Sequence, residues 1–344
     1  MCRSYRQHLT CGALAACLWF MASPDAKAGI VIQANYQDAV GEGFNDQSAY
    51  NGSTLGEARK NAFEFALNIW GNALAPSYAG EKITIDAQFN SLGGTSVSPI
   101  LAQSGASDFI SVNSSNPLVY SEALANHLQG VDINPNTSEG FATFNSDIGV
   151  SVDTSKSWYY GTDDLAAANE YDFVTAALHE IGHVLGFEGL INSDGSYYDP
   201  TPGDASDQDL FNQYDYYVVR SSDQAILRNL SQADREQAIA GDNISWAGAQ
   251  AMAANGGAPL KLHAPSTWKD GSSYSHLDEA TFQFELMSPD YNDGTQQALS
   301  ALTIGMMVDM GWTSAVPEPG AFAVFSILAI STGLIRRRRK THAV

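Results

Sequence analysis

Apolar and polar residues follow two different rhythms along the chain, and each rhythm predicts a kind of element. Residues 82–89 alternate with a period of two, which is typical of a half-buried strand, and residues 30–36 are a second strand candidate. Residues 141–144 and 148–152 are shorter candidates. Between the first two strands, apolar residues recur at helical spacing after a possible N-cap at Ser53 or Thr54; these positions are Ala62, Phe65, Ala66, Ile69 and Ala73.

A second helix is predicted over residues 171–186. Asp172 can cap its N-terminus, and Gly186 can end it, because glycine readily adopts the left-handed conformation that often follows a helix. The next segment, residues 191–217, is rich in Asp, Asn, Gly and Tyr and predicts a long surface excursion. Strands with a helix, then a central helix, then an irregular half predict an α+β domain with a cleft between two lobes.

The N-terminal segment, residues 1–28, has the features of a secretory signal peptide. It begins with a positively charged region, continues with an apolar stretch and ends in Ala26-Lys27-Ala28, an A-x-A cleavage pattern. A lipobox that ends at Cys17 is the alternative, although cleavage there would divide the apolar stretch. The chain has three cysteines, Cys2, Cys11 and Cys17, so removal of this segment leaves no disulfide, thiolate ligand or cysteine nucleophile.

The C-terminal segment, residues 315–344, combines a Val-Pro-Glu-Pro-Gly box, an apolar run over residues 321–335 and five basic residues over 336–340. As a helix, the apolar run would be about 22 Å long, shorter than the hydrocarbon core of about 30 Å. A plain tail anchor is one interpretation. The order of the three parts resembles the PEP-CTERM sorting signal of Gram-negative bacteria. This resemblance implies an exosortase-type partner, a transient anchor in the inner membrane, and export to the cell surface or beyond.

The charge of the chain excludes several classes of partner. Of 344 residues, 17 are basic and 38 acidic, and the segment 29–335 retains 9 basic and 37 acidic residues once both ends are set aside. Nucleic acids and anionic lipids require a basic face, so we expect neither as a partner, apart from the membrane contact of the C-terminal segment. With 44% apolar residues, the chain can bury a real core.

The predicted central helix carries His179-Glu180-Ile181-Gly182-His183, an H-E-x-x-H pattern. Residues four apart lie on one helix face, so His179 and His183 can bind one zinc ion together. Zinc lowers the pKa of a bound water to about 7, and the carboxylate of Glu180 is placed to take its proton as the water attacks a carbonyl. The pattern therefore predicts a catalytic zinc site with Glu180 as the general base.

The residues from His179 to Phe187 resemble the metzincin metalloproteases, a clan in which the glycine at 186 turns the chain sharply after the helix. The usual pattern has its third histidine three residues after that glycine, but this chain has Gly189 there. A third ligand from another segment is therefore expected. His276 is the first candidate, and His263, His127, a carboxylate such as Glu188, or a water are the alternatives.

Residues 284–289, Phe-Glu-Leu-Met-Ser-Pro, look like the Met-turn of the metzincins, in which a methionine packs beneath the zinc histidines; ordinary core packing of Met287 is the alternative. Leishmanolysin-like metzincins similarly insert a long segment before their third histidine, which here would run from about Glu188 to Tyr274. Residues 300–312 resemble the closing helix of secreted bacterial relatives. The implied protease domain spans 29–314, with an N-terminal lobe and active-site helix (29–190), an insertion (191–260) and a C-terminal lobe (261–314).

These features predict an exported zinc endopeptidase that acts on proteins or peptides. A surface or matrix protein that keeps a metzincin fold around a structural metal is the alternative, and hydrolysis of non-peptide bonds is a second enzymatic one. Calcium is a further candidate ion, because the excursion offers carboxylates, although their spacing is not that of an EF-hand and a solvated acidic loop would look the same. These carboxylates are Asp194, Asp199, Asp204, Asp207 and Asp209.

Overall fold

A computed structural model describes residues 29–112, 117–198, 209–290 and 297–315. Its largest sheet has the strand order β1-β4-β10-β7. β4 (Lys82–Asn90) lies between β1 (Val31–Tyr36) and β10 (Gly140–Asn145) and runs parallel to both, whereas β7 (Ala102–Ala106) is antiparallel to β10 and forms one edge. The alternation predicted for β4 is confirmed, since alternate residues are buried; these are Ile83, Ile85, Ala87 and Phe89.

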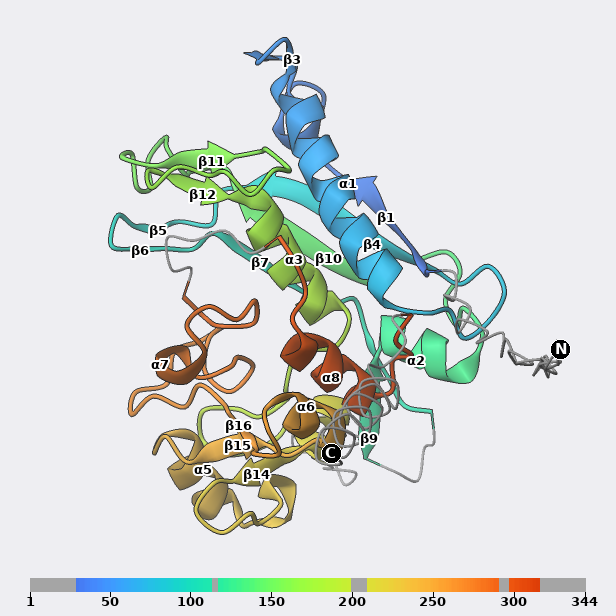
Figure 1. The fold of residues 1–344 in the computed structure, drawn as a ribbon, viewed down its shortest axis with the longest axis vertical. Helices are drawn as coiled ribbons and strands as arrows, with labels where there is room; N and C mark the ends of the chain where they lie inside the picture. The colour runs from blue at the N-terminus through green and yellow to red at the C-terminus, as the bar shows by residue number, and fades with distance from the viewer. Residues whose placement is uncertain (1–28, 113–116, 199–208, 291–296, 316–344) are drawn as a thin grey trace, which may run out of the picture.

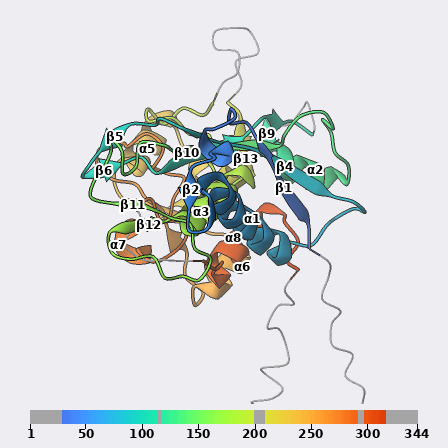
Figure 2. The same cartoon turned by 90° about the horizontal axis from the view of Figure 1, so that it is seen from above.

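Two helices cover one face of this sheet, and Figures 1 and 2 show them side by side. α1 (Leu55–Ala73) begins at Thr54, whose side chain accepts a hydrogen bond from the Glu57 amide, so the second predicted N-cap is the one used. α3 (Phe173–Val184) packs against α1, and the Trp70 indole donates a hydrogen bond to the Leu178 carbonyl at 2.9 Å. The α1 contact therefore fixes the helix that carries the H-E-x-x-H pattern.

The ends of α3 follow from two residues. Asp172 caps its N-terminus by accepting a 2.6 Å hydrogen bond from the Thr175 amide. Gly186 has a φ of +106°, and a Cβ there would lie 2.8 Å from Ser121 Oγ, so both conformation and space require glycine. The helix is two residues shorter at its start than predicted, because residues 170–172 form a strand, β12, that pairs with β11 (Ser157–Tyr159).

The later half of the chain has a smaller sheet, β14-β15-β16, with short helices around it in the lower half of Figure 1. Its elements are β14 (Val218–Arg220), α5 (Gln232–Ile239), β15 (Ile244–Trp246), α6 (Ala249–Ala254), β16 (Leu260–Lys261) and α8 (Ala301–Met310). α8 lies within the predicted closing helix. It packs closely on α6, where a Cβ on Gly305 would lie 2.8 Å from the Ala251 Cα atom.

The remaining elements are short. They are η1 (Gly43–Asn45), β2 (Ala49–Tyr50), β3 (Ser53–Thr54), β5 (Gly94–Thr95), β6 (Ser98–Pro99), β8 (Phe109–Ile110), β9 (Leu118–Ser121), α2 (Glu122–Gln129), β11 (Ser157–Tyr159), β12 (Glu170–Asp172), β13 (Phe211–Asn212), α4 (Gln213–Tyr216), η2 (Leu227–Asn229) and α7 (Glu279–Phe282). Several small sheets and separate helices confirm the α+β class.

Two local predictions are wrong. Residues 148–152 form a tight turn rather than a strand, because the amides of residues 150–152 all bond to the Asp147 carbonyl and Gly149 has a φ of +77°. Residues 191–217 do not stay at the surface, since Tyr214 and Asp215 at their end are fully buried.

Other predictions fall outside the described residues: the signal peptide (1–28), the sorting segment from residue 316 onward, and the carboxylates Asp199, Asp204 and Asp207. Among the helices that the structure describes, none is both long enough and apolar enough to cross a membrane.

Candidate metal centre

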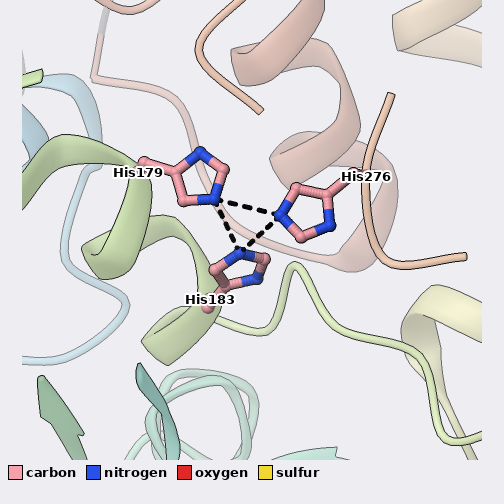
Figure 3. Close-up of side chains that lie close together, drawn as sticks. All are labelled: His179, His183 and His276. Carbon is pink, nitrogen blue, oxygen red and sulfur yellow. Dashed lines mark hydrogen bonds between the residues drawn. The ribbon is translucent and has the colours of Figure 1, made fainter. Parts of the chain in front are cut away.

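Three histidine side chains converge in one cleft. His179 and His183 lie one turn apart on α3, and His276 comes from the loop that precedes α7 (Figure 3). Their Nε2 atoms are 3.0 Å apart for His179 with His276, 3.0 Å for His179 with His183 and 3.2 Å for His183 with His276. A tetrahedral ion with metal–nitrogen bonds of about 2.0–2.1 Å holds its ligand nitrogens about 3.3 Å apart. The three side chains could therefore hold a metal ion with little rearrangement.

The second nitrogen of each ring is fixed by a main-chain carbonyl. The Nδ1 distances are 2.7 Å from His179 to Leu286 O, 2.6 Å from His183 to Phe187 O and 2.8 Å from His276 to Ser272 O. Because a carbonyl oxygen can only accept, each Nδ1 carries the proton and donates it. The three Nε2 atoms then present lone pairs to one another with no proton between them, and only a cation satisfies such a set.

Burial keeps these rings neutral. It lowers the pKa of His179, and burial together with the neighbouring His179 lowers the pKa of His183 to about 3. The pKa of His276 falls well below its usual value, first through burial and then through the charges that His183 and His179 would carry. Neutral imidazole is the form that binds a metal, so the ligand set needs no proton release at neutral pH.

Glu180 lies next to this centre on α3 and lines the same cleft. Its carboxylate accepts a 2.6 Å hydrogen bond from Ser104 Oγ of β7, and the same hydroxyl lies 2.9 Å from the Glu180 carbonyl oxygen. Burial raises the pKa of Glu180 to about 7, although the hydrogen bond from Ser104 opposes that shift. A carboxyl group that titrates near neutrality beside a metal centre is suited to proton transfer.

Met287 lies directly beneath the helix that carries two of the histidines. It is fully buried, and a Cβ on Gly182 would lie 2.8 Å from its sulfur atom. Glycine at position 182 therefore lets the thioether reach the backbone between His179 and His183. The Met287 carbonyl also accepts a hydrogen bond from the Leu277 amide, which ties the methionine to the loop of the third histidine.

The absence of a histidine at position 189 has a steric reason. A Cβ on Gly189 would lie 2.0 Å from Cε1 of Tyr274 and 2.8 Å from an Asp215 carboxylate oxygen. The Tyr274 ring fills the space of a side chain at 189, and Tyr274 is only two residues before His276. The later loop thus occupies this space with a tyrosine and supplies its own histidine beside it.

Asp215 holds this arrangement together from within the core. Its carboxylate accepts hydrogen bonds from the Leu190 amide, the Asn212 amide and the Tyr274 hydroxyl. Burial raises the pKa of Asp215 to about 7 and outweighs these donors, which lower it. One buried carboxyl group therefore links the turn after α3, the end of the excursion and the loop of His276.

The other candidates lie away from the histidine cluster. His127 is paired with Glu81 at 2.7 Å, and His263 is buried behind the loop of His276, where its Nε2 has no hydrogen-bond partner. Glu188 lines the cleft, and in the described residues it does not belong to a metal-binding group. Asp194 accepts two hydrogen bonds from Ser196, Asp209 lies 3.4 Å from Arg235, and neither belongs to a metal-binding group among the described residues.

The cleft around the histidines has a volume of about 1530 Å³. One wall is β7 with the β5–β6 hairpin, and the facing wall includes residues 268–276 and 283–290. Sequence reasoning missed Ser104, Asp215 and Tyr274. Only Asp215 had a local signal, a capping box with Asn212, and nothing in the sequence linked it to the metal centre.

Comparison with known proteins gave no match: no family model, no curated protein and no solved structure is similar to this chain.

Proposed function

We propose that this protein is an exported zinc endopeptidase of the metzincin type. The observation that carries the proposal is the histidine cluster: three proton-free Nε2 atoms converge beside the Glu180 carboxylate in a cleft large enough for a peptide. Three imidazoles and an open position are typical of catalytic zinc, whereas structural zinc sites are closed by four protein ligands. Among the described residues no fourth side chain joins the cluster, which favours catalysis over a structural ion.

His179, His183 and His276 would hold the zinc ion, which would supply Lewis acidity to polarise a carbonyl group and to lower the pKa of a water molecule. Glu180 accepts the proton of the attacking water and then donates it to the leaving amine. Ser104 holds one oxygen of this carboxylate, and among the described residues the other oxygen has no hydrogen-bond partner, so it is available to the water.

A peptide in the cleft would lie extended along β7. Within the described part of the chain, this strand pairs with β10 on one side only, and Ala102, Gln103 and Ser104 line the cleft. The free edge offers main-chain donors and acceptors to any sequence, so backbone pairing can place a scissile bond over the metal centre. The predicted signal peptide and sorting segment support export, and we propose the cell surface or the exterior as the site of action.

Casein hydrolysis by the purified protein with added zinc tests the proposal. We expect cleavage by the parent, loss of cleavage after chelation, and no cleavage by Glu180→Gln, which should still bind zinc. Glu236→Gln, an exposed carboxylate on α5, is the matched control and should cleave like the parent. Zinc binding without cleavage of casein or of a random peptide library would overturn the proposal in favour of a structural site, and equal activity in Glu180→Gln would refute the assigned base.

A further inference from the structure

Glu188 places an unpaired carboxylate in the cleft. Its side chain lines the cleft on the side where α3 ends, close to the edge strand: a Cβ on Gly105 of β7 would lie 3.5 Å from Glu188 Oε2. Among the described residues, this carboxylate has no hydrogen bond and no ion pair. Buried or half-buried carboxylates are normally satisfied, so a group left open at this point calls for an explanation.

The backbone around Glu188 is, by contrast, fully anchored. The Glu188 carbonyl accepts a hydrogen bond from the Asn212 amide group, the Gly189 amide donates to Ser275 Oγ at 3.1 Å, and the Leu190 amide donates to Asp215. The segment is therefore held from three directions, and the carboxylate projects from it at a fixed position. A preorganised charged group costs little entropy when it binds a partner.

The surroundings of Glu188 favour a cation. Burial raises the pKa of Glu188 to about 7, and the nearby Asp215 adds to that shift. Two lysines line the cleft, but neither lowers the pKa of Glu188: Lys156 lies over the Tyr171 ring, and Lys269 belongs to the loop of His276. A positive side chain brought by a bound peptide would offset both the burial and the neighbouring negative charge.

Other parts of the cleft lining differ in chemistry from Glu188. Val97 on the β5–β6 hairpin and Phe284 on the facing wall are 92% and 74% exposed, and both line the cleft. These side chains suit apolar parts of a peptide. Other carboxylates that line the cleft already have hydrogen-bond donors: Asp153 accepts from Tyr171, Asp270 from Trp268 and Glu285 from Ser300. Glu188 differs from these three because its carboxylate has no such donor among the described residues.

We propose that Glu188 selects peptides with an arginine or lysine side chain positioned next to the metal centre, on the side where α3 ends. This inference rests on the proposed peptidase function, because it names the substrate class of the same cleft. Glycine at position 105 leaves room beside the edge strand, so the cationic side chain of a peptide paired with β7 reaches the carboxylate.

Peptide binding tests the inference separately from catalysis. The probes are fluorescent peptides of one sequence in which a single position is Arg, Lys, Gln, Leu or Glu, scanned along the peptide. Anisotropy is measured on Glu180→Gln, which holds peptides without cleaving them. We expect one position where Arg and Lys bind about 10- to 100-fold more tightly than Gln, the range of a hydrogen-bonded ion pair. Equal affinities at every position overturn the inference.

Variants of Glu188 assign the preference to this residue. In the same background, Glu188→Gln should abolish the preference for Arg and Lys, and Glu188→Lys should favour Glu instead. Asp270→Asn is the matched control, because Asp270 also lines the cleft but accepts a hydrogen bond from the Trp268 indole; it should keep the preference. If Arg and Lys are still preferred in Glu188→Gln, the preference belongs to another group and the inference is overturned.

Casein hydrolysis separates this inference from the proposed function. Hydrolysis by the parent without any preference for basic residues overturns this inference alone, whereas absence of hydrolysis contradicts the proposed peptidase.

Discussion

The candidate metal centre lies between two regions that are held rigid by different interactions. His179 and His183 lie on α3, whose geometry fixes them one turn apart and whose position is set by packing against α1. His276 lies in an irregular loop, and buried polar contacts from Asp215 and Tyr274 position it. The helix side depends on local periodicity and apolar burial, whereas the loop side depends on hydrogen bonds between distant segments. The loop side should therefore be the more sensitive to single polar or steric changes.

Removal of the loop ligand should have the largest effect. His276→Ala leaves two imidazoles, and we expect zinc affinity to fall more than about 100-fold, beyond the range known for residues that only orient a ligand. Competition with a chromogenic chelator measures it. His263→Gln, a buried histidine of the same region that is not in the cluster, should remain within a few-fold of the parent. A His276→Ala variant with parental affinity would show that the ion binds elsewhere.

Addition of a methyl group at position 189 should have the second-largest effect. Gly189→Ala forces a Cβ into the Tyr274 ring, which is 1% exposed and has no room to move, so we expect a loss of about 1–3 kcal/mol in the free energy of unfolding. Denaturant unfolding of the metal-free protein measures this. The double variant Gly189→Ala/Tyr274→Ala should be less destabilised than the sum of its parts, and strict additivity would exclude the clash as the cause.

The pH dependence of stability tests whether the pKa of buried Asp215 is raised, and its effect should rank third. Its pKa of about 7 in the folded state lies above the unfolded value, so the folded state binds the proton more tightly. Protonation of Asp215 therefore stabilises the fold at acidic pH, and this stabilisation is lost as pH rises from about 4 through 7. The unfolding free energy of the metal-free parent, minus that of Asp215→Asn, should decrease by up to about 1.4 kcal/mol per pH unit in this window. A flat difference would mean that Asp215 is already ionised at acidic pH.

Ser104→Ala should have the smallest effect. It removes the hydroxyl that orients Glu180 but no metal ligand, so we expect kcat to fall about 10-fold while KM and zinc affinity stay near the parental values. Peptide hydrolysis kinetics measure kcat and KM, and chelator competition measures zinc affinity. Ser104→Thr keeps the hydroxyl and should recover most of the rate; a rise in KM alone would instead assign Ser104 to peptide binding.

The two regions also differ in how far the sequence predicts them. The β4 strand and the α1 helix with its Thr54 cap follow from periodicities of two and 3.6 residues, which burial of one face imposes directly, whereas α3 follows from its terminal residues Asp172 and Gly186. The turn at 148–152 escaped this reasoning, because its apolar residues suggest a strand while three amides share the Asp147 carbonyl. Local patterns cannot reveal a hydrogen-bond arrangement that overrides them.

For the candidate site, the H-E-x-x-H helix could be recognised from spacing alone, since both ligands and the base lie on one element. His276 required a resemblance and the exclusion of other histidines. The network behind it could not be predicted, because Asp215 and Tyr274 are 59 residues apart in the chain and lie together only in the folded state. The acidic composition of residues 191–217 pointed to solvent, yet one of these carboxyl groups is buried at the core of the loop side.

The separation of 97 positions between His179 and His276 has a consequence for folding. An ion held by both histidines acts as a reversible cross-link across this span, and closing a loop of about 100 residues in the unfolded chain corresponds to about 4.7 kcal/mol in the chain-entropy treatment of disulfides. A complete ligand set also requires the whole intervening segment to have folded, so under the proposed function a chain that is still unfolded during export would have no catalytic centre. The separation of the ligands would thus couple the onset of the proposed activity to the completion of folding.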